Sequence, residues 1–176
     1  MDLTFITGIL GSLVLVTGAA WPSKKVSHPT KSKKNWLLAI GSFIMLLFSI
    51  MGYLAGGNVF FVFLEIFVVI ATVLMMLNTN DKLDTLILSI TGAVLIGWSL
   101  KLFQDTSTIY FTLGLIGVGL GYAFEVTTFR RNLALTLGSA LIAYFSFLEP
   151  NWIFFWLNAF FALFSGYYLV KDYRRA

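Results

Sequence analysis

Long apolar runs separated by short polar connections recur along the whole chain. Each run has roughly the 20 residues that a helix needs to cross a hydrocarbon layer about 30 Å thick. The connections are short except the first, Pro22 to Lys34, so we expect consecutive helices to pack as antiparallel neighbours. We predict seven transmembrane helices: Leu3 to Trp21, Asn35 to Leu54, Asn58 to Leu77, Leu83 to Phe103, Ile109 to Val126, Asn132 to Leu148 and Asn151 to Val170.

The composition supports the same fold class, an all-α integral membrane protein. Of the 176 residues, 59% are hydrophobic and 11% are charged, and the mean hydropathy is +0.88. A water-soluble domain with a polar surface could hardly reach these values. Cysteine is absent, which excludes disulfides and thiolate metal sites. The one histidine, His28, has no second ligand nearby in the sequence, so we expect no enzyme, metal site or cofactor.

Lysine and arginine predict the orientation, because positive residues in short loops stay on the cytoplasmic side. With the amino terminus outside and the carboxyl terminus inside, only Lys101 lies toward the outer side. The net charge of +4 therefore reflects membrane topology and does not indicate nucleic acid. The residues that would lie inside are Lys24, Lys25, Lys31, Lys33, Lys34, Lys82, Arg130, Arg131, Lys171, Arg174 and Arg175.

Three blocks of the first half recur in the second half, in the same order. Phe5-x-x-Gly8-x-x-Gly11 recurs as Phe111-x-x-Gly114-x-x-Gly117. The second block is Asn35, Leu38, Gly41, Ser42, Phe48 and Ser49, which recurs as Asn132, Leu135, Gly138, Ser139, Phe145 and Ser146. The third is Asn58, Phe61, Leu64 and Phe67, which recurs as Asn151, Phe154, Leu157 and Phe160.

The order of these blocks predicts two three-helix repeats, residues 1–78 and 106–176, joined by a linker helix within residues 79–105. Because the linker returns the chain across the membrane, both repeats enter from the same side. They are therefore parallel repeats related by an axis along the membrane normal, and we expect a cavity between them.

Glu65 is the one carboxylate in the apolar run from Asn58 to Leu77, and Asn158 holds the matching position in the last helix. An ionisable residue in a transmembrane helix normally faces a bundle interior or a wet cavity, where burial disfavours its charged form. Glu65 could couple transport to protons, bind an amine-bearing solute, accept hydrogen bonds from a polyol, or bond a neighbouring helix as a protonated acid. Asn158 can donate and accept hydrogen bonds.

Aromatic residues accompany both positions, and glycines suggest how the helices pack. Trp156 lies close to Asn158 and Phe63 close to Glu65, where a ring could stack on a sugar, attract a cation or simply pack in the core. Small residues let helix backbones approach closely, which assigns Gly8, Gly11, Gly114 and Gly117 to packing or to a hinge. The pairs Gly41-Ser42 and Gly138-Ser139 are hinge candidates, because serine can satisfy a loosened backbone.

Triplet, linker and triplet, with the amino terminus outside, resemble the MtN3/PQ-loop superfamily over essentially the whole chain. This superfamily includes the SWEET and SemiSWEET sugar transporters, and the PnuC-type vitamin transporters are similar. The resemblance implies that Glu65 and Asn158 line a central substrate pocket with Phe63 and Trp156, in the place of the asparagines of SWEET-like proteins. This chain lacks the Pro-Gln pair and the prolines inside the helices.

We therefore expect a small-solute transporter in a bacterial or archaeal inner membrane, working by alternating access around a central pocket. A sugar-like polyol, a vitamin-like solute or a small amine is favoured over an anion, because the helices offer no buried lysine or arginine. Proton coupling through Glu65 is a further hypothesis. The alternative is a receptor or assembly protein on the same scaffold. Membrane lipids and the solute are the expected partners, and a homo-oligomer is compatible with the sequence.

Overall fold

The computed structural model describes residues 2–21, 28–77, 80–124 and 128–173. Lys24, Lys25, Arg174 and Arg175, which contributed to the predicted orientation, lie outside this part. Within it the chain is helical throughout, with the elements α1 (Leu3–Ala20), η1 (Pro29–Lys31), α2 (Lys33–Leu54), α3 (Phe60–Leu77), α4 (Asp81–Lys101), α5 (Thr106–Ala123), α6 (Phe129–Leu148) and α7 (Trp152–Tyr173).

All seven α-helices are long and apolar enough to cross a membrane. The chain is thus an all-α membrane protein, as its apolar pattern predicts. Helix ends lie close to the predicted positions, and some of the differences occur where polar residues begin or end a helix. For example, α5 begins at Thr106 rather than Ile109, and α7 continues to Tyr173 rather than Val170.

Side-chain caps explain why some helices start earlier than their apolar residues suggest. The carboxylate of Asp105 accepts a hydrogen bond from the backbone N–H of Ser107 (2.7 Å). The hydrogen bonds from Ser107 also hold the pKa of Asp105 below its usual value. The hydroxyl of Thr128 accepts in the same way from the N–H of Arg131 at the start of α6 (3.3 Å). Such caps satisfy the free N–H groups of the first helical turn, so these helices begin in polar sequence.

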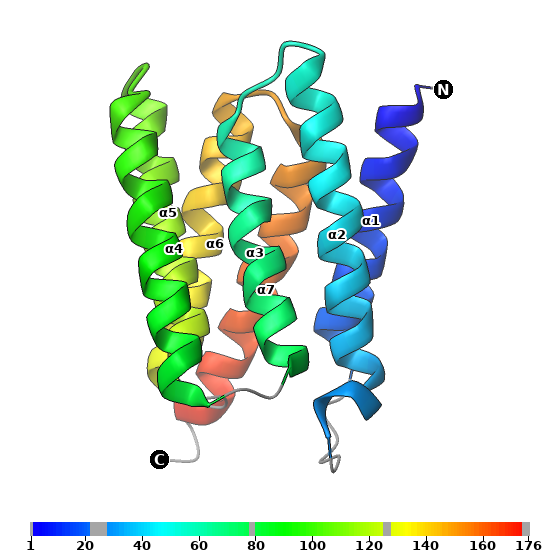
Figure 1. The fold of residues 1–176 in the computed structure, drawn as a ribbon, viewed down its shortest axis with the longest axis vertical. Helices are drawn as coiled ribbons and strands as arrows, with labels where there is room; N and C mark the ends of the chain where they lie inside the picture. Colours follow the sequence, from blue (N-terminus) through cyan, green and yellow to red (C-terminus); the bar gives the residue numbers. More distant parts are fainter. Residues whose placement is uncertain (1, 22–27, 78–79, 125–127, 174–176) are drawn as a thin grey trace. The chain divides into compact units, whose positions relative to one another are not determined.

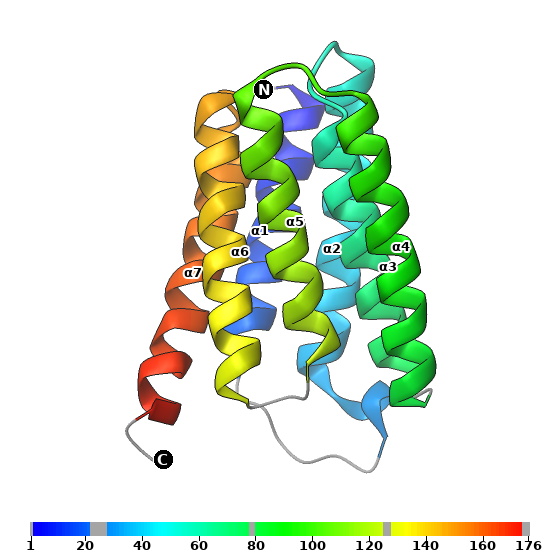
Figure 2. The ribbon, with the colours of Figure 1, turned by 90° about the vertical axis from the view of Figure 1, so that its left-hand side faces the viewer.

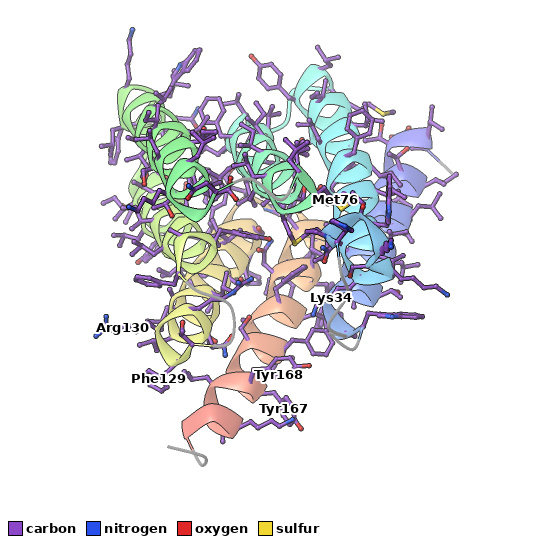
Figure 3. The ribbon with its side chains drawn as sticks, turned by 60° about the horizontal axis from the view of Figure 1, so that its bottom comes forward. Lys34, Met76, Phe129, Arg130, Tyr167 and Tyr168 are labelled. Carbon is purple, nitrogen blue, oxygen red and sulfur yellow. The ribbon has the colours of Figure 1, made fainter. Side chains whose placement is uncertain are left out.

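The chain forms two compact units, Met1–Asp84 (unit 1) and Thr85–Ala176 (unit 2). In unit 1, α1 packs against α2 and α2 packs against α3, while η1 contacts α2 and α3. Figure 1 shows α1 and α2 side by side. A tight turn joins α2 to α3: Gly56 has a φ of +92°, and the N–H of Gly57 donates to the carbonyl of Gly52 (2.9 Å). Figure 3 shows Lys34 and Met76 at the opposite end, where α2 begins and α3 ends.

Glycines bring the backbones of α1 and α2 close together. A methyl group on Gly41 would lie 2.9 Å from the backbone nitrogen of Leu15, and one on Gly18 would lie 3.1 Å from that of Leu38. One on Gly11 would lie 3.0 Å from the sulfur of Met45. The small residues therefore set how closely α1 and α2 approach.

In unit 2, α5 packs against α6 and α6 packs against α7, as Figure 2 shows. Glycines again lie at the closest approach. A methyl group on Gly138 would lie 2.5 Å from the backbone nitrogen of Val118, and one on Gly114 would lie 2.7 Å from the side chain of Ile142. Gly121 faces the side chain of Leu135. The α5–α6 interface is thus built as the α1–α2 interface is.

Buried positions correspond closely between α2 and α6, at the offset that takes Gly41 to Gly138. The buried residues of α2 are Gly41, Ser42, Met45, Phe48 and Ser49. The residues at the corresponding positions of α6 are Gly138, Ser139, Ile142, Phe145 and Ser146, and all of them are buried.

The contacts set a different register for α1 and α5 from the one inferred above. Gly11 faces Met45 and Gly114 faces Ile142, at corresponding positions of α2 and α6. Gly11 therefore corresponds to Gly114, and the pairing of Gly8 with Gly114 is wrong by three residues. The spacing of the glycines explains the error. Because they recur every three residues, a shift of three residues again aligns glycine with glycine. Only the facing helix distinguishes the two registers.

Candidate functional site

The carboxylate of Glu65 is the most unusual group in the described structure. Its side chain is 2% exposed, and no hydrogen-bond donor among the described residues reaches its Oε2 atom. Buried polar atoms are nearly always hydrogen-bonded, so an unpaired carboxylate oxygen requires an explanation. In a membrane helix, such a group is a functional-site candidate.

A hydrogen bond between two hydroxyls fixes how α2 lies against α3. The Oγ atom of Ser42 and the Oγ1 atom of Thr72 are 3.0 Å apart, and both residues are buried. Seven residues is close to two helical turns, so it returns to the same face of a helix about 10 Å further on. On antiparallel helices, seven residues from this bond toward the Gly56 turn leads to Ser49 on α2 and Glu65 on α3. We call Ser49 and Glu65 the α2–α3 pair.

By this register Ser49 lies at the level of Glu65, which makes it a candidate site residue that the sequence pattern does not indicate. Its side chain is 3% exposed, and its hydroxyl donates to the carbonyl of Leu46 (2.8 Å). The signal that the sequence carries is the recurrence of Ser49 as Ser146. A serine in an apolar helix usually satisfies itself in this way, so the recurrence alone did not indicate a site.

Unit 2 contains a corresponding set of residues, which we call the α6–α7 pair: Ser146 and Asn158. Asn158 is 7% exposed and Ser146 is fully buried. The Nδ2 atom of Asn158 donates to the carbonyl of Phe154 (2.9 Å), and the hydroxyl of Ser146 donates to that of Ile142 (2.7 Å). A methyl group on Gly166 of α7 would lie 3.7 Å from Thr136 of α6. This register places Ser146 and Asn158 at about the same level.

Burial supports the correspondence between Glu65 and Asn158. The buried residues of α7 are Phe154, Leu157, Asn158 and Ser165. The residues at the corresponding positions of α3 are Phe61, Leu64, Glu65 and Thr72, and all of them are buried. The acid and the amide therefore occupy the same place within their own three-helix groups.

The aromatic residues predicted for the site differ from one another. Phe63 is buried and its ring lies 6.1 Å from that of Phe60. Trp156 is 56% exposed and packs edge-on against Phe155, with ring centroids 5.1 Å apart. Two residues along a helix are about 200° apart, so Trp156 and Asn158 project from different sides of α7, and Phe63 and Glu65 from different sides of α3. The structure thus does not bring Trp156 to Asn158, because closeness in sequence is not closeness on a helix face.

The glycine and serine positions lie within unbroken helices. Gly41 and Ser42 are buried inside α2, and Gly138 and Ser139 are buried inside α6. Gly8 is buried in α1, while a methyl group on Gly117 would lie 2.7 Å from the Cα atom of Gly138. These positions make close helix contacts, and their action as hinges stays a prediction.

A double-mutant cycle should measure the Ser42–Thr72 hydrogen bond. We expect Ser42→Ala and Thr72→Val to be non-additive in the free energy of unfolding, with a coupling energy of about 0.6 kcal/mol and at most about 1.7 kcal/mol, the range for interhelical hydrogen bonds in membranes. Unfolding of the purified protein by denaturant in detergent gives the four values. Additive effects would show that the bond does not join the helices in the folded protein.

The described residues contain no group of three histidine, aspartate or glutamate side chains able to hold a metal ion. The two pairs themselves offer hydroxyl, carboxyl and amide groups. Comparisons of the chain with protein-family models, with curated proteins and with solved structures found no match.

Proposed function

We propose that this protein is a small-solute membrane transporter of the MtN3/PQ-loop type. The observation that carries the proposal is the buried carboxylate of Glu65, whose Oε2 atom has no hydrogen-bond partner among the described residues, at a position that corresponds to Asn158. In this proposal α1–α3 and α5–α7 are parallel repeats joined by α4, and they alternate access around a midplane pocket that contains both residues. The equivalent packing within each three-helix group supports the repeats.

The proposed orientation has the amino terminus outside and the carboxyl terminus inside, in a bacterial or archaeal inner membrane. Positive residues cluster at helix ends that this topology puts inside. In the described part these residues are Lys31, Lys33, Lys34, Lys82, Arg130, Arg131 and Lys171. The membrane lipids are then the partners of the exposed apolar faces, and a homo-oligomer is compatible with this orientation.

The solute is small and polar and is either neutral or an amine. Among the buried side chains of the described residues there is no lysine or arginine to pair with an anion. Glu65 supplies negative charge, and the remaining buried polar groups are hydroxyls and one amide. A sugar-like polyol, a vitamin-like solute or a small amine fits these groups.

Uptake by reconstituted vesicles tests the proposal. The purified full chain is placed in lipid vesicles and offered labelled sugars, vitamins and small amines, with protein-free vesicles as the control. We expect saturable uptake of at least one solute class above the control. Saturable binding without flux would contradict transport.

Such a result would instead favour a receptor or assembly protein on the same scaffold. One observation supports this alternative. The three prolines, Pro22, Pro29 and Pro150, lie in or beside the connections, and the helices run without internal proline kinks that could open and close a gate.

A further inference from the structure

When Glu65 is ionised, the α2–α3 pair presents hydrogen-bond acceptors and no free donor. The hydroxyl proton of Ser49 points to the carbonyl of Leu46 (2.8 Å), which leaves the lone pairs of its oxygen. An ionised carboxylate accepts hydrogen bonds and donates none, and Oε2 of Glu65 has no donor among the described residues. A ligand that satisfies this pair must bring the hydrogen atoms itself.

The α6–α7 pair also offers more hydrogen-bond acceptors than donors, but it carries no charge. The hydroxyl of Ser146 donates to the carbonyl of Ile142 (2.7 Å), and the amide nitrogen of Asn158 donates one hydrogen to the carbonyl of Phe154 (2.9 Å). The oxygens of both side chains remain as acceptors, beside one amide hydrogen. In each unit, two side chains thus have oxygen atoms that can accept hydrogen bonds from a ligand.

We propose that the α2–α3 pair binds a primary ammonium group, with Ser49 as a binding residue beside Glu65. An ammonium has three N–H donors and no acceptor, so it can satisfy the carboxylate and the serine oxygen together. Its charge also neutralises Glu65, which has no other buried ionisable side chain near it among the described residues. The inference rests on the proposed function, in that it names the solute class for the same site.

Other small solutes fit these groups less well. A quaternary ammonium brings the charge but no N–H, so the Ser49 oxygen stays unsatisfied. The hydroxyls of a polyol bring donors together with acceptors, and they leave the charge of Glu65 unpaired. An anion would meet a carboxylate with no buried cation to compensate. Buried polar groups left unpaired are what a specific site uses to reject the wrong ligand.

Ligand-induced stabilisation of the purified full chain in detergent tests the inference. The probes are ethylammonium, tetramethylammonium and ethylene glycol, at matched ionic strength and at concentrations up to about 100 mM, because ligands of a few heavy atoms bind at best near millimolar. We expect ethylammonium to raise the melting temperature in a saturable way, as a ligand of the native state does. The other two should leave it unchanged.

Substitutions test whether ethylammonium binds at the α2–α3 pair. Ser49→Ala and Glu65→Gln should each weaken the apparent affinity for ethylammonium at least about tenfold, since hydrogen bonds to charged groups are the stronger ones. Ser99→Ala is the matched control: Ser99 is buried in α4 and its hydroxyl also donates to a backbone carbonyl, that of Leu95 (2.8 Å). This control should bind as the wild type does.

The outcomes separate the solute class from transport. Equal stabilisation by tetramethylammonium or ethylene glycol would overturn the inference, as would full affinity in Ser49→Ala, and the wild-type comparison stands even if a variant fails to fold. Uptake of a neutral solute without ethylammonium binding would also overturn it, while leaving transport intact. Ethylammonium binding without uptake would support the inference and would contradict only the proposal that the protein transports the solute.

Discussion

Gly138→Ala is expected to cause the largest loss of stability that a single added methyl group can produce in unit 2. The methyl would lie 2.5 Å from the backbone nitrogen of Val118 and 2.7 Å from the carbonyl carbon of Gly117. Backbone atoms cannot rotate away as a flexible side chain can, so α5 and α6 must separate. Overpacking typically costs about 1–3 kcal/mol and at times more, and we expect a loss at the upper end of this range.

The measurement is the free energy of unfolding of the purified protein in detergent. Gly97→Ala is the control, because a methyl group there meets nothing within 4 Å. In that exposed part of α4 the substitution should stabilise the protein by up to about 1 kcal/mol, since alanine favours a helix more than glycine does. An unchanged Gly138→Ala protein would show that α5 and α6 are not packed as closely as described.

Gly41→Ala extends the same comparison to unit 1. Its methyl would meet the backbone nitrogen of Leu15 at 2.9 Å and the side chain of the same residue at 2.8 Å. Part of this contact is a side chain that can move, so the loss should be smaller than at Gly138. The ranking Gly138 above Gly41 above Gly97 follows from the atoms that each methyl group meets.

The helices and their approximate ends could be predicted from the sequence, because an apolar run long enough to span a membrane is a strong one-dimensional signal. The early start of α5 could not be predicted in that way. It depends on Asp105 and Ser107, polar residues that a hydropathy pattern assigns to a connection although they form the cap. Caps are visible in sequence only when the helix start is already known.

The sequence predicts a site residue that is unusual by itself. It does not predict one whose role depends on how two helices pack against each other. Glu65 stands out because a carboxylate in an apolar run is rare. Ser49 does not, since its relation to Glu65 requires the register of α2 against α3, which the Ser42–Thr72 bond reveals. The role of Trp156 stays a prediction, because sequence separation gives depth in the membrane but not the direction in which a side chain points, and its exposed ring projects from a different side of α7 than Asn158.

Glu65→Gln is expected to lower solute uptake at least about tenfold and to abolish its dependence on pH. The substitution keeps the shape and removes both the charge and the titration. Glu65 is the only ionisable residue among the buried side chains of the described part. The other buried polar side chains of α2 and α3 are those of Ser42, Ser49 and Thr72, which end in hydroxyls. Among the described residues no other buried group is then available to restore a response to protons.

The sign of the pH effect follows from competition for one carboxylate. The ionised form binds an ammonium, and the protonated form does not, so uptake of ethylammonium by the wild type should fall as the pH is lowered. By linkage, bound ammonium must weaken proton binding by the same factor. Vesicle uptake at several pH values is measured for the wild type and for Glu65→Gln. Asn158→Ala serves as the control, since it should lower uptake and keep the pH dependence.

Competition also determines the direction of coupling. If the proton and the ammonium occupy Glu65 in turn, each half of the transport cycle carries one of them, and the protein exchanges solute for proton rather than carrying both together. An imposed gradient with the acidic side inside the vesicles should therefore accelerate uptake, and the opposite gradient should slow it. Acceleration by an acidic exterior, or an unchanged response to pH in Glu65→Gln, would show that the coupling proton binds elsewhere.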